Sequence, residues 1–264
     1  MEVSNKKQIE RRHYNKAASK IKNIRYAERR HSPALELPDD FCKSIISNLC
    51  KEKTLLDYGC GIGLESVYFA KRGARVIAID ISEKSLNIAK QLAKSQSVSD
   101  KISFKQMDAE SLKIKNDSID IIYNRGTLSC VNLNKALSEW ARVLKPAGIA
   151  IGRDTLGHNP LFNLNRKIKY LQGKRTKQTL NNILKIQDLK TFNLYFKKTE
   201  FKFFNLTNIL PLPYPVYKFL QKIDNIILNN TFLKRYAFKV VFILSNPVKP
   251  NKKNQNANKI SKRT

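Results

Sequence analysis

The segment from Thr54 to Gly63 constrains the fold of this chain more than any other. It reads Thr-Leu-Leu-Asp-Tyr-Gly-Cys-Gly-Ile-Gly, an apolar stretch followed by an acidic residue and three alternating glycines. Glycines let the backbone turn sharply and approach a ligand closely. A helical pattern begins at Leu64. Strand, turn and helix N-terminus together predict a ligand cradle at the carboxyl edge of a parallel sheet.

A dinucleotide site is one alternative for this turn. Its fingerprint, G-x-G-x-x-G, requires a glycine where Leu64 stands, and here the third glycine is Gly63. Asp57 lies inside the turn, where a carboxylate attracts a cationic amino group and repels pyrophosphate. The pattern therefore favours a ligand with a cationic group. A Gly-rich turn with no ligand remains the second alternative.

Two further predicted strands end in acidic residues. The strand Arg75–Asp80 ends about 20 residues after the glycines, where doubly wound nucleotide folds place the carboxylate that binds ribose hydroxyls. Ser82 is the predicted N-cap of a helix over residues 83–94. Residues 101–107 form the third predicted strand, which is followed by Asp108. These acids are expected at the same sheet edge as the glycines.

The pattern continues through a fourth and a fifth strand. Residues 119–124 form an apolar strand, and the apolar face of residues 133–144 predicts an amphipathic helix. Leu144-Lys145-Pro146-Ala147-Gly148 then predicts a turn, because proline and glycine end helices. The fifth strand covers residues 149–154.

The block Asp57-x-Gly59-x-Gly61-x-Gly63 resembles the first motif of class I S-adenosylmethionine (SAM)-dependent methyltransferases. The turn at 144–148 is similar to a turn of the same family, and the resemblance covers about Asp57 to Asp154. Residues 157–160, Gly-His-Asn-Pro, resemble a block in one bacterial group of these enzymes. The resemblance implies an α/β, Rossmann-like, seven-stranded and mostly parallel sheet with helices on both faces. Its last strand, residues 236–244, would be antiparallel.

The resemblance also implies a SAM site at the sheet edge. The glycine turn would hold the amino-acid end of SAM, Asp80 the ribose and Asp108 the adenine amino group. His158 follows strand five and is the predicted proton acceptor, since histidine titrates near neutral pH. Alternatively, His158 only orders its own turn. The predicted cofactor-binding residues are Asp57, Gly59, Cys60, Gly61, Gly63, Asp80, Ile81, Asp108, Ala109 and Asn124.

The sequence predicts three parts. Residues 1–50 are expected to form an N-terminal helical lid, and residues 51–247 the methyltransferase domain. Within that domain, residues 157–198 are expected to cap the acceptor, with a mobile loop or short helix over 166–178 and a helix over 187–196. A strand is predicted at 200–206, a turn at 210–215 and a helix at 216–228. Residues 248–264 are expected to be a basic, disordered tail.

Charge and cysteine content bound the partners and the compartment. The formal net charge is +29, which favours nucleic acid, anionic lipid or a phosphorylated substrate, although a chain rich in Lys, Asn and Ile can reach it through genome bias. The four cysteines contain no C-x-x-C pair, so free thiols, no metal site and a cytoplasmic location are expected. No run approaches the ~18 apolar residues of a membrane span.

Methyl transfer to a small-molecule acceptor, anionic or lipid-like, is the predicted function, and it needs no metal. Residues 124–127, Asn-Arg-Gly-Thr, do not match the "NPPY" or "DPPY" block that amino-methylating nucleic-acid enzymes carry after strand four. An RNA methyltransferase is therefore the second hypothesis, motivated by the basic charge. A SAM-binding regulatory module without catalysis is the third.

Overall fold

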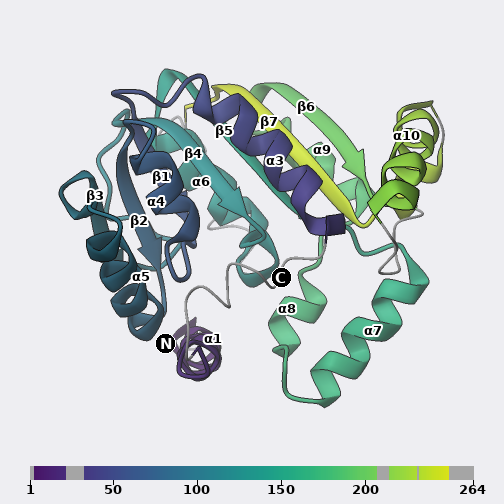
Figure 1. Cartoon of the computed structure of the whole chain (residues 1–264), viewed down its shortest axis with the longest axis horizontal. Helices are drawn as coiled ribbons and strands as arrows, with labels where there is room; N and C mark the ends of the chain where they lie inside the picture. The colour runs from purple at the N-terminus through teal and green to yellow at the C-terminus, as the bar shows by residue number, and fades with distance from the viewer. Residues whose placement is uncertain (1–2, 22–32, 207–213, 231, 250–264) are drawn as a thin grey trace, which may run out of the picture.

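Seven strands in the described residues form one mixed sheet (Figure 1). The computed structural model describes residues 3–21, 33–206, 214–230 and 232–249. The strand order is β3-β2-β1-β4-β5-β7-β6, with β7 antiparallel to both neighbours and the other pairs parallel. This arrangement confirms the predicted fold class and the antiparallel last strand. The strands are β1 Thr54–Tyr58, β2 Arg75–Asp80, β3 Ile102–Gln106, β4 Ile119–Arg125, β5 Leu144–Thr155, β6 Phe196–Phe204 and β7 Lys239–Pro247.

Helices cover both faces of the sheet (Figure 1). Helices α3, α4 and α5 pack on one face, and α6 and α9 pack on the other. Among the described helices, none combines the length and the apolar character that a membrane crossing requires. The helices are α1 Val3–Ala18, α3 Pro33–Ser47, α4 Leu64–Ala70, α5 Glu83–Ser95, α6 Leu133–Val143, α7 Pro160–Leu171, α8 Lys177–Asn181, α9 Leu189–Phe192 and α10 Tyr214–Asn230; the short 3-10 turns are η1 Ser99–Lys101, η2 Leu128–Cys130, η3 Ile186–Asp188 and η4 Phe232–Tyr236.

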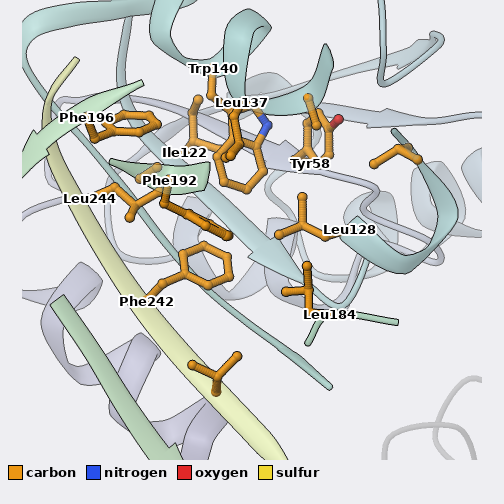
Figure 2. Close-up of a cluster of buried hydrophobic side chains, with 14 of the residues drawn as sticks. Tyr58, Ile122, Leu128, Leu137, Trp140, Leu184, Phe192, Phe196, Phe242 and Leu244 are labelled. Atoms are coloured by element: carbon orange, nitrogen blue, oxygen red, sulfur yellow. The ribbon is translucent and has the colours of Figure 1, made fainter. Parts of the chain in front are cut away.

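Aromatic side chains fill the core beneath α6 (Figure 2). Trp140 is fully buried, and its ring lies 5.1 Å from the Tyr58 ring, edge to face. On the other side it lies 6.0 Å from Phe242 of β7. Edge-to-face and offset pairs are favourable beyond their buried area. Trp140 therefore joins β1 to the antiparallel end of the sheet through one packed layer.

Helix α7 is longer and better defined than the sequence predicted. Residues 166–178, expected to be a mobile loop or a short helix, instead contain the end of α7, which begins at Pro160 and ends at Leu171, a turn, and the start of α8 at Lys177. Asn159 is the N-cap of α7, because its side chain accepts from the backbone N–H groups of Leu161 and Phe162. Proline fits the first helical position, where no N–H partner is needed. The Asn-Pro pair is thus a helix start signal.

Two other predicted boundaries were wrong. The turn expected at 144–148 belongs to β5, whose register with β4 shifts between Ile119 and Ile121, so the extra residues bulge out of the ladder. The helix expected over 187–196 is only η3 and α9, because Phe196 already pairs with Pro247 of β7. The predicted turn at 210–215 and the tail after 249 lie largely outside the described residues, as do residues 1–2 and 22–32 of the predicted lid.

Asp39 of α3 ties its helix to two strands. Its buried carboxylate pairs with Arg153 of β5 and accepts from Arg125 Nε of β4 at 2.9 Å. Burial alone raises the pKa of Asp39, but the two guanidinium groups outweigh burial and lower it to about 2. A lowered folded-state pKa stabilises the fold at pH values above the unfolded pKa. That stabilisation is lost as the pH falls through the folded pKa.

We expect Asp39→Asn to lower the free energy of unfolding at pH 7 by roughly 3–5 kcal/mol, because it leaves Arg153 buried without its counter-charge. Urea unfolding of both proteins measures the difference, which should shrink as the pH falls from 7 towards 2. Asp100→Ala, at an exposed position in η1, is the control and should change stability by no more than about 0.5 kcal/mol. Equal stability of Asp39→Asn and wild type at pH 7 would contradict this account.

Candidate functional site

The glycine turn after β1 is shaped by close contacts. Gly59 has φ +76°, and a Cβ there would lie 2.2 Å from Thr127 Oγ1. Gly63 has φ +79°, and a Cβ there would lie 2.7 Å from Ala89. Gly61 differs, because a Cβ there would meet nothing within 4 Å. Two of the glycines therefore allow close packing, and Gly61 presents its backbone to open space.

A cavity of about 200 Å³ lies against this turn. The carboxyl ends of β1 to β4 and helix α1 contribute its walls. Six of the ten predicted cofactor residues line it, namely Gly59, Gly61, Asp80, Ile81, Asp108 and Ala109. Four do not line it, namely Asp57, Cys60, Gly63 and Asn124.

Asp57 faces the core beneath the turn. It is buried, and Ser66 Oγ of α4 donates to its carboxylate at 2.5 Å. Burial raises its pKa to about 7. Asn124 is also buried and shapes the loop after β4, since its Oδ1 accepts from Thr127 N at 3.2 Å. Both side chains support the cavity from behind.

Asp80 presents a carboxylate to the cavity with a fixed orientation. Its Oδ2 accepts from Gly61 N at 2.9 Å, and its Oδ1 accepts from Ser82 N at 2.8 Å. Burial raises the pKa of Asp80, and these backbone N–H groups partly offset the rise. Each carboxylate oxygen can accept a further hydrogen bond. The side chain can therefore receive two donors from a ligand, as paired ribose hydroxyls would supply.

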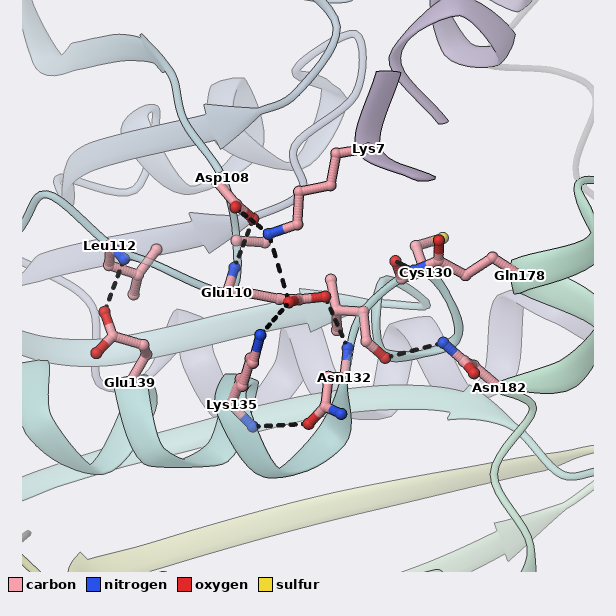
Figure 3. Close-up of polar contacts among 12 residues, drawn as sticks. Lys7, Asp108, Glu110, Leu112, Cys130, Asn132, Lys135, Glu139, Gln178 and Asn182 are labelled. Carbon is pink, nitrogen blue, oxygen red and sulfur yellow. Dashed lines mark hydrogen bonds and ion pairs between the residues drawn. The ribbon is translucent and has the colours of Figure 1, made fainter. Parts of the chain in front are cut away.

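Helix α1 lies across the opening of the cavity, and polar contacts hold it there. Lys7 forms an ion pair with Asp108 and lies 3.3 Å from the Glu110 carboxylate (Figure 3). At the other end of the helix, Asn15 Oδ1 accepts from Ser82 Oγ at 2.7 Å. The sequence predicted a lid in this region but assigned no binding role to any residue of it.

Helix α1 contributes Lys7, Glu10 and Tyr14 to the cavity wall. These positions follow helical spacing, but no motif distinguishes them from other residues of a basic helix. Arg125, Gly126 and Thr127 after β4 also line the cavity. In the sequence analysis this last segment served only to judge whether the substrate is a nucleic acid.

His158 lies outside the described cavity walls. Its Nε2 accepts from Ile186 N at 2.9 Å, and burial lowers its pKa. The lone pair that a general base needs is therefore directed at the backbone of η3. The structure gives His158 a contact that orders its turn, and its catalytic role stays a prediction that this geometry does not support.

A second and larger cavity, of about 1130 Å³, adjoins the first. Helices α1 and α8, the start of α6 and the segment 182–191 contribute to its walls. The two cavities share four lining residues, Lys7, Glu10, Glu110 and Val131. Two adjoining chambers, one with the glycine turn and one lined by α1 and α8, can hold two reactants side by side.

Known proteins are similar in sequence to the segment that contributes most of the walls of the smaller cavity. Residues 56–152 match the family model of the methyltransferase domain. Malonyl-[acyl-carrier protein] O-methyltransferase of Yersinia pestis is 33% identical over 144 residues, which are 54% of this chain and 50% of that protein. Ubiquinone biosynthesis O-methyltransferase of Agrobacterium fabrum is 34% identical over 96 residues, 36% of this chain and 38% of that protein. The chain thus matches about half the length of these curated relatives or less.

Solved structures share the fold over a longer stretch. YcgJ of Bacillus subtilis superposes with a TM-score of 0.55 at 21% identity, covering 84% of this chain and 100% of that one. Phosphoethanolamine N-methyltransferase 2 of Haemonchus contortus, solved with S-adenosyl-L-methionine, superposes with a TM-score of 0.56 at 17% identity. The superposition covers 80% of this chain and 53% of that one. At these identities the likeness concerns the fold alone. With the glycine turn, the matched model and the curated relatives identify residues 56–152 as a class I SAM-dependent methyltransferase domain.

Proposed function

We propose that this protein transfers a methyl group from SAM to a small-molecule or lipid-like acceptor. The observation that carries the proposal is the pair of adjoining cavities, which share Lys7, Glu10, Glu110 and Val131. The smaller one has the glycine turn and the fixed carboxylate of Asp80. The larger one has room for an organic acceptor of substantial size.

The residues of the smaller cavity fit SAM. Asp80 is half-buried and has accepting capacity left for two ribose hydroxyls. Asp108, now paired with Lys7, would accept from the adenine amino group. The open space beside Gly61 admits a ligand close to the backbone. With SAM bound in this way, Asp57 would support the turn from the core instead of touching the amino-acid end of SAM.

The residues of the chain mainly bind the two reactants and orient them towards each other. SAM supplies a methyl group on a cationic sulfur, which is already activated for attack. The carboxyl ends of the strands hold one reactant, and α1 and α8 hold the other, so alignment supplies most of the catalysis. Helix α1 covers the junction and limits the access of water through its contacts to Asp108 and Ser82.

The acceptor class rests on the larger cavity and on helix α7. The two curated relatives named above are O-methyltransferases of malonyl-[acyl-carrier protein] and of ubiquinone biosynthesis, which supports an organic acceptor. Helix α7 exposes an apolar stripe at spacings of three and four residues and contains no acidic residue, which supports a lipid-like one. The stripe consists of Leu161, Leu164, Ile168 and Leu171.

RNA methylation is the second candidate, favoured by the net charge of +29 and by the 10 basic and 1 acidic residues between 157 and 198. Such a surface binds polyanions in a salt-dependent way. The positive surface does not distinguish RNA from anionic lipid.

Asp80→Ala should weaken SAM binding by about 1–3 kcal/mol, because it removes charged hydrogen bonds to the ribose. Isothermal titration with SAM measures the change, and Asp100→Ala is the matched control. SAM affinity equal to wild type, or tighter binding of NAD than of SAM by the wild type, would refute the cofactor assignment.

Labelled SAM incubated with the protein and fractionated cell extract should transfer label to the small-molecule or lipid fraction. RNA should receive little label, because residues 124–127 after β4 lack the block that amino-methylating nucleic-acid enzymes carry there. Label in RNA that disappears between 50 and 200 mM salt would favour the second candidate. SAM binding without transfer to any fraction would favour a regulatory module.

His158→Ala should lower the free energy of unfolding by about 1 kcal/mol, since the variant loses the hydrogen bond from Ile186 N. Turnover per folded molecule should stay close to wild type. Urea unfolding and initial rates with labelled SAM separate the two effects. A fall in turnover on the order of 10²-fold, at unchanged SAM affinity, would instead establish His158 as a general base.

A further inference from the structure

Glu10 of helix α1 is buried without a hydrogen-bond partner among the described residues. The residue is 4% exposed, and neither carboxylate oxygen receives a donor. It lines both cavities at their junction. A buried carboxylate without donors is costly, so such groups are normally paired. The position of Glu10 points to a donor that comes from a ligand.

The neighbours of Glu10 direct their donors elsewhere. Tyr14, one turn later, bonds to Cys130 Sγ at 3.0 Å. Lys7, nearly one turn earlier, is engaged with Asp108 and Glu110. Thr176 lies near Glu10, but its hydroxyl donates to Thr179 Oγ1 at 3.1 Å. Burial raises the pKa of Glu10.

A second buried acceptor atom lines the larger cavity. Gln178 of α8 donates from Nε2 to the backbone oxygen of Cys130 at 2.7 Å (Figure 3), which fixes the amide orientation. Its Oε1 is then the opposite atom, and it is buried without a partner among the described residues. Gln178 and Glu10 thus approach the loop at Cys130 from two different helices.

Glu10 and Gln178 thus present three acceptor atoms that receive no donor from the described residues, and Gln178 Nε2 already donates one N–H to Cys130. A protonated primary amine brings three N–H donors, a hydroxyl brings one, and a carboxylate brings none and repels Glu10. We propose that Glu10 and Gln178 bind the methyl acceptor through an amino group and that the enzyme is an N-methyltransferase. This inference rests on the proposed function.

The chemistry balances with Glu10 as the proton acceptor. Glu10 takes one proton from the ammonium nitrogen and becomes a neutral carboxylic acid. The released lone pair forms the N–C bond to the methyl carbon, while the electrons of the C–S bond pass to sulfur, which leaves as a neutral thioether. Burial favours the neutral form of Glu10 after the proton transfer. Lysines in the larger cavity suit an anionic group elsewhere on the same acceptor; they are Lys6, Lys7, Lys135, Lys177 and Lys185.

Three probes that have the same alkyl chain length and differ in their polar group test the class of acceptor by their binding. With S-adenosylhomocysteine present, octylamine should bind the wild type more tightly than 1-octanol or octanoate does. Glu10→Gln should weaken octylamine binding at least tenfold and leave the affinity for S-adenosylhomocysteine unchanged. Glu83→Gln, at an exposed position of α5, is the control and should bind octylamine like wild type. Absence of an octylamine preference in a protein that binds S-adenosylhomocysteine would overturn the inference.

Two further readouts separate this inference from the proposed function. Glu10→Met, which removes the unpaired charge, should raise the Tm of the ligand-free protein by about 2–4 °C, whereas loss of a paired carboxylate would lower it. Label transferred from SAM to extract should resist alkali, as N-methyl groups do. Alkali-labile methyl esters would refute the amine acceptor and leave the methyltransferase in place. No SAM binding and no transfer at all would refute the proposed function itself.

Discussion

The common direction of β1 to β4 is the constraint on which the site depends. Parallel strands deliver their carboxyl ends to one edge of the sheet, so residues distant in sequence meet there. Gly59 lets that edge close tightly, because Thr127 occupies the space where a Cβ would lie and donates its hydroxyl to Tyr58 O at 3.0 Å. This contact joins the turn after β1 to the loop after β4. The floor of the cavity therefore depends on the parallel direction of these strands and on the absence of a side chain at Gly59.

Much of this edge was predictable because its signals are local. Gly59, Gly61, Asp80 and Asp108 each lie at or shortly after the carboxyl end of a strand, and the structure places all four in the cavity wall. Asp57 differs from these four residues, and its contact with SAM stays a prediction. It lies within β1, where side chains alternate between faces, and its own side chain points to Ser66 of α4.

The contributions of α1 and α3 were not predictable from local patterns. Lys7 and its partner Asp108 are 101 residues apart, and Asp39 and Arg153 are 114 apart. A basic helix and a single buried aspartate carry no sequence signal for such pairings, since these depend on how the helices pack. Helix α7 differs, because Asn159 and Pro160 do carry a local signal for its start.

The charge of the surface and the charge of the site have opposite signs. The chain carries +29, yet Asp80, Asp108, Glu10 and Glu110 all line the smaller cavity. A cationic ligand is favoured by these carboxylates at contact distance, whereas the surface charge acts over about a Debye length and is screened by salt. The net charge therefore indicates which molecules the protein attracts to its surface, and the carboxylates of the cavity indicate which ligand it binds. A sulfonium and a protonated amine are both cations, and both would meet at the junction that Glu10 occupies.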